Sequence, residues 1–127
     1  MSRIVYVNGE FLPEDAACLS VFDRGVLFAD AVYEVTAVVD GGMVDFDAHQ
    51  QRLCRSLAEL GIDFDPRAAG LLELHRELIR RNALNEGLVY LQVSRGVADR
   101  SFLQPTTCQP SVVLFTQAQS LLETAAA

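Results

Sequence analysis

The sequence predicts an α+β fold in which two α-helices pack against an antiparallel β-sheet. Three observations lead to this prediction: segments rich in β-branched residues lie near both ends of the chain, two amphipathic segments lie between them, and short turn signals separate the elements. The order of strands, then helices, then strands is typical of α+β domains. The length of 127 residues favours a single domain with one hydrophobic core.

The N-terminal segment predicts a β-hairpin. Residues 3–7 alternate around an apolar centre and are followed by Asn8-Gly9, the dipeptide most typical of tight hairpin turns. Residues 10–12 form the expected return strand, which Pro13 ends. The next segment, residues 18–30, is expected to be a loop.

The strongest strand signal covers residues 31–40 and ends at Gly41-Gly42, where a turn leads into a return strand over residues 43–46. Side chains alternate along a strand, so two sets face opposite sides of the sheet. One set is Tyr33, Val35 and Ala37, and the other is Val32, Glu34 and Thr36.

Two helices follow. The first begins at Asp47 as N-cap, runs to Leu60 and ends at Gly61. The second begins at Asp65-Pro66 and ends near Asn82. Each helix carries an apolar stripe at a spacing of three to four residues, which predicts one buried face.

Two further strands complete the predicted sheet. Residues 88–95 and residues 111–116 have strand composition, and the polar residues 96–110 form a loop between them.

The composition excludes several classes of function. A net charge of -7 argues against binding to nucleic acid or to anionic membrane surfaces. No apolar run approaches the roughly 18 residues of a membrane span, and the N-terminus lacks the apolar stretch of a signal peptide. The three cysteines, Cys18, Cys54 and Cys108, are scattered, which is typical of reduced thiols in a cytoplasmic protein.

All ten basic residues are arginines. An arginine side chain stays protonated at neutral pH and does not act as an amine nucleophile. The chain by itself therefore cannot catalyse a reaction that passes through a lysine amine.

Three side chains are candidates for binding. Arg52, on the flank of the first helix, could clamp a phosphate or could cover apolar surface with its stem. Arg100, in the polar loop, could bind a carboxylate or pair with Asp99 in solvent. Tyr33 is expected to be a core tyrosine whose hydroxyl needs a partner, and Glu34, on the opposite face, could simply be solvated.

The two histidines do not predict a metal site. His49 and His75 both lie on apolar helix faces, and neither has a second histidine at metal-binding spacing. Both are expected to be core histidines.

Three blocks of residues, taken in order, carry a resemblance to a known family. They are Asp23-Arg24-Gly25 followed by Phe28, Asp30 and residues 32–35; His49, Arg52 and Leu53; and residues 90–96 followed by Arg100. Together they resemble the N-terminal domain of the class IV pyridoxal-phosphate aminotransferases, and most of all the D-amino-acid aminotransferases. The resemblance extends from Tyr6 to about Thr116.

The resemblance implies the small domain of a two-domain, homodimeric enzyme with pyridoxal 5'-phosphate bound between the domains. Its substrates would be an amino acid and a 2-keto acid. Arg52 would bind the cofactor phosphate. Tyr33 and Val35 would line the substrate pocket, and Arg100 would complete the carboxylate site of the neighbouring subunit.

The resemblance also implies a division of the chain. Residues 1–120 would form the small domain, and residues 121–127 would begin the linker to a C-terminal domain. That second domain would carry the Schiff-base lysine, so the 127-residue chain alone is expected to be inactive.

Phe102 departs from the family pattern, because the D-amino-acid enzymes usually carry a histidine there. The change removes one donor to the substrate carboxylate. Branched-chain aminotransferases and aminodeoxychorismate lyases share the fold, so a fragment of either is an alternative interpretation. A non-catalytic binding module that keeps the fold is another.

Overall fold

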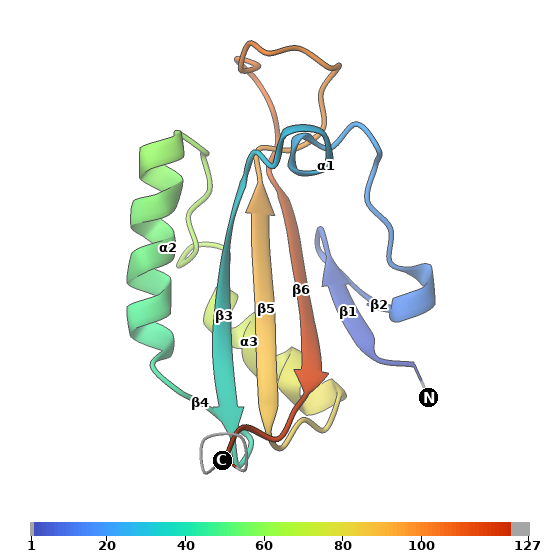
Figure 1. Ribbon diagram of the computed structural model, residues 1–127, viewed down its shortest axis with the longest axis vertical. Coiled ribbons are helices and arrows are strands. Elements are labelled where there is room, and N and C mark those ends of the chain that lie inside the picture. The colour runs from blue at the N-terminus through green and yellow to red at the C-terminus, as the bar shows by residue number, and fades with distance from the viewer. Residues whose placement is uncertain (1, 123–127) are drawn as a thin grey trace.

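The computed structural model describes residues 2–122 and confirms the α+β fold class (Figure 1). One sheet has the strand order β2-β1-β6-β5-β3-β4, and every neighbouring pair is antiparallel. The strands are β1 (Ile4–Val7), β2 (Glu10–Pro13), β3 (Ala31–Val39), β4 (Gly42–Met43), β5 (Gly87–Ser94) and β6 (Ser111–Ala118). The helices are α1 (Arg24–Phe28), α2 (Phe46–Leu60) and α3 (Leu71–Arg81), with a 3-10 turn η1 at Glu14–Ala16.

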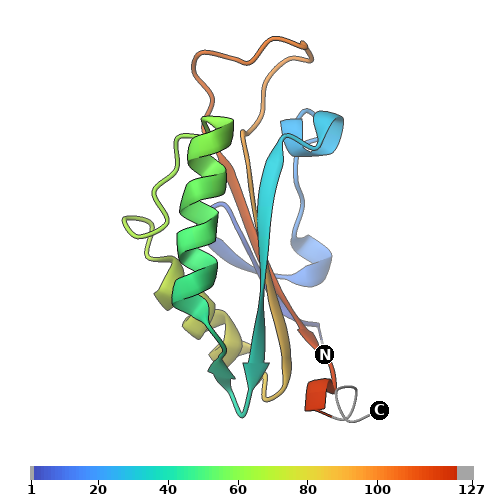
Figure 2. The ribbon, with the colours of Figure 1, turned by 60° about the vertical axis from the view of Figure 1, so that its left-hand side comes forward.

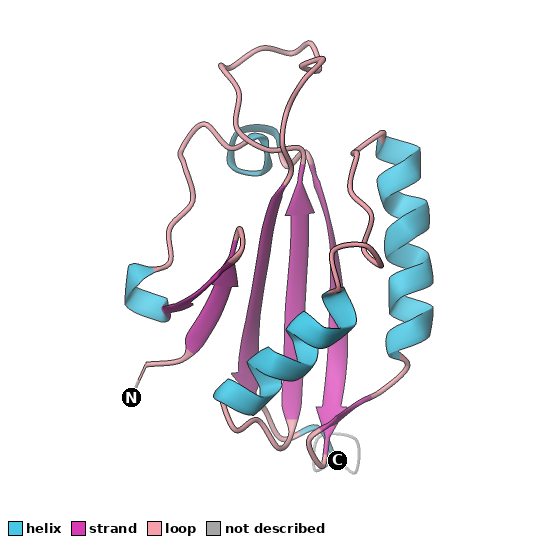
Figure 3. Cartoon of the chain, turned by 180° about the vertical axis from the view of Figure 1, so that it is seen from behind, coloured by secondary structure: helices cyan, strands magenta, loops and turns pink. Residues whose placement is uncertain are grey.

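The sheet has one covered face and one open face. Helix α2 runs beside β3, and α3 crosses the same face of the sheet (Figure 3). The segment that carries η1 and α1 lies on the other side (Figure 2). The hydrophobic core therefore lies between the sheet and α2 and α3; its fully buried members include Val38, Leu53, Leu57, Leu71, Leu78, Val89, Val93 and Leu114.

The predicted alternation along β3 is confirmed. Glu34, Thr36 and Val38 are buried beneath the helices, whereas Tyr33 points to the open face. The prediction that Tyr33 is a core residue is wrong, because 63% of it is exposed. Its ring stacks on Tyr90 of the neighbouring strand, with 5.6 Å between ring centroids.

The loop expected over residues 18–30 contains a helical turn. Asp23 caps α1 by accepting a hydrogen bond of 2.8 Å from the Gly25 amide. Gly25 also allows a close approach: a Cβ atom there would lie 3.0 Å from both Asp23 Oδ1 and Ser94 Cβ. The turn is only five residues long, too short to show periodicity in the sequence.

Both long helices begin at other residues than the sequence predicts. Helix α2 starts at Phe46, because Asp45 adopts a left-handed conformation (φ 58°) directly after the β3–β4 hairpin. Residues 44–46 therefore do not extend β4. Helix α3 starts at Leu71, because Gly70 is left-handed (φ 69°) and separates it from the turn that Asp65 initiates.

Candidate functional site

A buried carboxylate on β3 binds two side chains from α2. Glu34 accepts hydrogen bonds of 2.8 Å from Nε and 2.8 Å from Nη2 of Arg52. His49 Nδ1 lies 2.7 Å from Glu34 Oε1. His49 and Arg52 are three residues apart, so they project from the same face of the helix.

The side chains of this cluster differ widely in their exposure to solvent. The Glu34 side chain is 5% exposed, whereas that of Arg52 is 58% exposed. The prediction that Glu34 is solvated is wrong, because α2 covers this face of β3. His49, at 25% side-chain exposure, is likewise not a core residue, whereas His75 is buried as predicted.

The charges of the cluster stabilise one another. Burial opposes ionisation of Glu34, but the hydrogen bonds from Arg52 and His49 outweigh it and lower the pKa of the carboxyl group. In return, Glu34 raises the pKa of Arg52. The pair is therefore ionised at neutral pH, and the carboxylate holds the guanidinium in a fixed orientation.

Arg52 retains the capacity to bind an anion. Within residues 2–122, no acceptor is recorded for its Nη1, because the contacts to Glu34 use only Nε and Nη2. The side chain borders an open groove of about 470 Å³, lined by Asp45, Ala48, His49, Gln51, Arg52 and Arg55. A phosphate group is compatible with this exposed, oriented cation.

The open face of the sheet, opposite the face that α2 covers, carries an aromatic wall of three stacked rings, Tyr33, Tyr90 and Phe115. Tyr33 borders a hollow of about 250 Å³, together with Gly25 and Gln92. The Tyr90 hydroxyl donates to Gln92 Oε1 at 3.0 Å, so Tyr90 is held behind Tyr33. Val35 lies two residues along the same face and is 37% exposed. The hollow beside Tyr33 can accept a small organic group.

Arg100 lies in the loop between β5 and β6. Its guanidinium carbon is 5.3 Å from the ring centroid of Phe28 and 5.0 Å from that of Phe102. Within the described residues it forms no recorded ion pair, so the expected pairing with Asp99 is wrong. No contact of Arg100 with Tyr33 or Arg52 is recorded in that part of the chain either. One chain thus places Tyr33 and Val35 on the open face of β3, and Arg52 beside Glu34 on the face that α2 covers, and leaves Arg100 in the separate β5–β6 loop.

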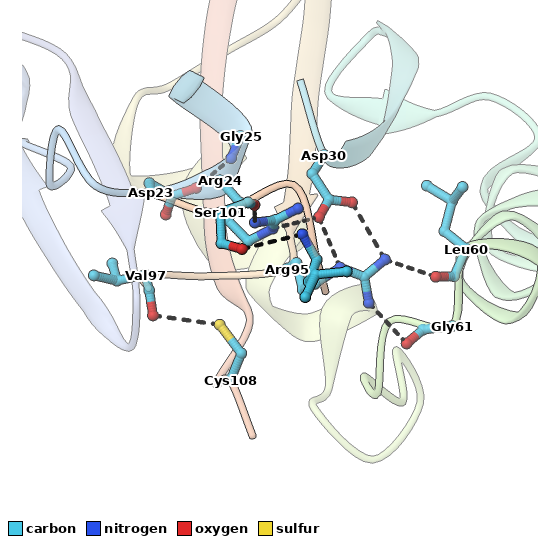
Figure 4. Close-up of polar contacts among 11 residues, drawn as sticks. Asp23, Arg24, Gly25, Asp30, Leu60, Gly61, Arg95, Val97, Ser101 and Cys108 are labelled. Atoms are coloured by element: carbon cyan, nitrogen blue, oxygen red, sulfur yellow. Dashed lines mark hydrogen bonds and ion pairs between the residues drawn. The ribbon is translucent and has the colours of Figure 1, made fainter. Parts of the chain in front are cut away.

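A second charged cluster was missed by the sequence reasoning. Asp30 accepts hydrogen bonds from Arg24 Nε at 2.9 Å and from Arg95 Nε at 2.7 Å (Figure 4). Arg95 also donates to the carbonyl oxygens of Leu60 at 2.7 Å and Gly61 at 3.0 Å. All three side chains belong to the blocks that carry the family resemblance, but nothing local in the sequence indicates that Arg24 and Asp30 meet Arg95.

Comparisons with known proteins agree on one family. Residues 31–127 match the family model described as amino-transferase class IV. D-alanine aminotransferase from Staphylococcus aureus is 36% identical over 114 residues, which cover 89% of this chain and 40% of the relative. The corresponding protein of Bacillus licheniformis is 36% identical over 112 residues, covering 88% and 40%.

Solved structures share the fold. A branched-chain amino acid aminotransferase from Escherichia coli superposes with a TM-score of 0.85 at 20% identity, over 96% of this chain and 41% of that one. A 4-amino-4-deoxychorismate lyase from Pseudomonas aeruginosa superposes with a TM-score of 0.73 at 28% identity, over 91% of this chain and 40% of the lyase chain.

None of the helices described within residues 2–122 has the length and apolar character that a membrane-spanning helix needs.

Proposed function

The chain belongs to the amino-transferase class IV family, and from this premise we propose that it is the small domain of an enzyme that transfers the amino group of a D-amino acid to a 2-keto acid. The observation that carries the proposal is the exposed Arg52, held in orientation by the buried Glu34, the residue that follows Tyr33 on β3. The D-alanine aminotransferase relatives support the choice of a D-amino acid. The chain spans 40% of the length of those relatives.

Enzymes of this family use pyridoxal 5'-phosphate. When bound, the cofactor supplies the electron sink that allows the α-proton of an amino acid to be removed. In this chain Arg52 would hold the phosphate through Nη1, the nitrogen that does not bond Glu34. Glu34 and His49 would keep the guanidinium oriented and charged.

The remaining residues would bind and orient the substrate. Tyr33 and Val35 would form one wall of the pocket and keep water from the reacting carbon. Arg100 would bind the α-carboxylate in the site of a second subunit, which agrees with its position away from Tyr33 and Arg52 in its own chain. The enzyme would then be a homodimer in which each protomer completes the other's site.

The sequence has no lysine, so the group that holds the cofactor covalently and moves the α-proton must come from elsewhere. We assign it to a C-terminal domain that follows residues 1–120 through a linker beginning at residues 121–127. This chain alone would then be inactive. The complete enzyme would work in the cytoplasm.

The other functions found on this fold differ in substrate. The lyase remains a second candidate, because Phe102 replaces the histidine usual in D-amino-acid enzymes and the lyase structure is 28% identical. A branched-chain aminotransferase would instead act on L-amino acids.

An assay of the full-length protein loaded with cofactor would separate these candidates. We expect D-alanine and a 2-keto acid to yield pyruvate and a D-amino acid, measured by chiral chromatography. L-leucine and 4-amino-4-deoxychorismate serve as the competing substrates. Turnover of either of these together with none of D-alanine would contradict the proposal.

The substitution Arg100→Ala tests the carboxylate contact. Losing a charge-assisted hydrogen bond should raise KM for the amino acid about 10-fold or more. Asp99→Ala, which changes the neighbouring exposed charge, is the control and should leave KM within about twofold, as for a surface charge. An unchanged KM in Arg100→Ala would refute the role of this arginine.

A further inference from the structure

The segment that carries Arg100 is attached to the rest of the domain by a buried arginine. Arg24 Nη1 donates a hydrogen bond of 2.8 Å to the carbonyl oxygen of Ser101, the residue after Arg100 (Figure 4). For residues 99–107, all within the described chain, this is the only recorded hydrogen bond from outside the segment. The position of Arg100 therefore depends on Arg24.

The ring of Phe28 adds a second contact between the same two parts of the chain. Phe28 lies one helical turn after Arg24 on α1, and the Arg24 guanidinium carbon is 4.6 Å from its ring centroid. The Arg100 guanidinium lies over the same ring at 5.3 Å, and the Phe28 and Phe102 centroids are 5.8 Å apart. Arg24 thus holds the backbone beside Arg100, and Phe28 contacts its side chain.

Arg24 is itself rigidly held. Its side chain is 5% exposed, and Asp30 binds both its Nε and Arg95. The hydrogen bonds from Arg95 and Arg24 overcome the effect of burial and lower the pKa of Asp30, so the carboxylate stays ionised at neutral pH. Arg95 continues the network to the C-terminal end of α2 but makes no recorded contact with residues 99–107.

We propose that Arg24 is a positioning residue for Arg100, an inference that rests on the proposed carboxylate role of Arg100. The Arg24 guanidinium bonds Asp30 through Nε and the Ser101 carbonyl oxygen through Nη1, and these two bonds fix the loop before the substrate binds. Fixing the loop in advance reduces the ordering cost of binding, so its loss should weaken substrate binding.

Arg24→Lys tests this inference. Lysine keeps the positive charge near Asp30 but lacks the second guanidinium nitrogen that donates to Ser101. In the full-length, cofactor-loaded enzyme we expect KM for the amino acid to rise about fivefold, less than in Arg100→Ala, because the variant keeps Arg100 and loses only the advance ordering of its loop, with kcat within about twofold. The matched control is Arg95→Lys, which alters the same network without touching the loop. An equal rise in KM in both variants would overturn the proposal.

A double-mutant cycle shows whether Arg24 acts through Arg100. If it does, Arg24→Lys should add little to KM when Arg100 is already alanine. The same fivefold effect on the Arg100→Ala background would overturn the proposal. If Arg100→Ala alone leaves KM unchanged, the proposed function of Arg100 fails, and the exchange measurement below decides separately whether Arg24 holds the loop.

Hydrogen exchange provides a readout that does not depend on activity. In the cofactor-free protein, amides of residues 99–107 should exchange several-fold faster in Arg24→Lys than in the wild type or in Arg95→Lys. If Arg24→Lys does not fold, Arg24→Met replaces it, because methionine fills the volume of the arginine stem but donates no hydrogen bond to Ser101. That variant should also raise KM and speed up exchange. Unchanged exchange in the folded variant would overturn the proposal.

Discussion

Replacing Arg52 by alanine in the full-length enzyme is expected to raise the dissociation constant for pyridoxal 5'-phosphate by about 10- to 100-fold. This range corresponds to the loss of a hydrogen bond between charged groups. Arg52 is 58% exposed and fixed by two contacts of 2.8 Å to Glu34, so its free edge is already oriented for a phosphate. Equilibrium dialysis against the cofactor, followed by absorbance, measures the change.

The ion pair complicates this experiment, and the chain offers the control. Arg52→Ala leaves the buried Glu34 carboxylate with His49 as its one recorded side-chain partner, which should also destabilise the fold. The double variant Arg52→Ala/Glu34→Gln removes that unpaired charge. We expect the double variant to recover thermal stability while cofactor affinity stays low. Recovery of both would mean that Arg52 acts through the fold and does not bind phosphate.

The elements with a clear period were predicted correctly from the sequence. Alternation identified β3 and its two faces, and Asn8-Gly9 identified the first hairpin, which pairs Val7 with Glu10. The helix starts were wrong because single left-handed residues, Asp45 and Gly70, decide where each helix begins. The spacing of hydrophobic residues carries almost no information about the backbone conformation of one residue.

The sequence predicts which residues belong to the candidate site, but it does not predict which of them contact one another. The alternation already placed Glu34 on the same face as Thr36, so its burial beneath a helix was inferable. Its pairing with Arg52, 18 positions later, depends on how α2 lies against β3. Asp30 and Arg95 are 65 positions apart and meet because β3 pairs with β5, with Ala31 opposite Ser94. Such long-range pairs follow from sheet topology, which local patterns do not encode.

Asp30→Asn is expected to destabilise the protein more than any surface charge substitution. Asp30 is the recorded carboxylate partner of two arginines whose side chains are 5% and 7% exposed. Asparagine has the same shape but no charge, so both guanidinium groups would stay buried without a counter-ion. Breaking a buried pair in this way costs about 3 kcal/mol or more. Chemical denaturation at neutral pH measures the loss.

A surface cluster provides the contrast for Asp30. Hydrogen bonds from Arg80 and Arg81 lower the pKa of Glu77 to about 2, yet all three side chains are substantially exposed. Solvent screening makes such pairs weak contributors, so Glu77→Gln should change the denaturation midpoint far less than Asp30→Asn. A larger effect at Glu77 would contradict the view that burial determines the energetic importance of these ion pairs.

The effect of Asp30 should also depend on pH in a defined direction. Its pKa in the folded protein lies below the ordinary value of 3.8, so ionised Asp30 stabilises the folded state at pH values above that point. This contribution is lost as the pH falls through the lower pKa of the folded state. The stability difference between wild type and Asp30→Asn should therefore be constant from pH 7 to about pH 5 and shrink below about pH 4. A difference that persists undiminished at acid pH would mean that Asp30 acts through packing and not through its charge.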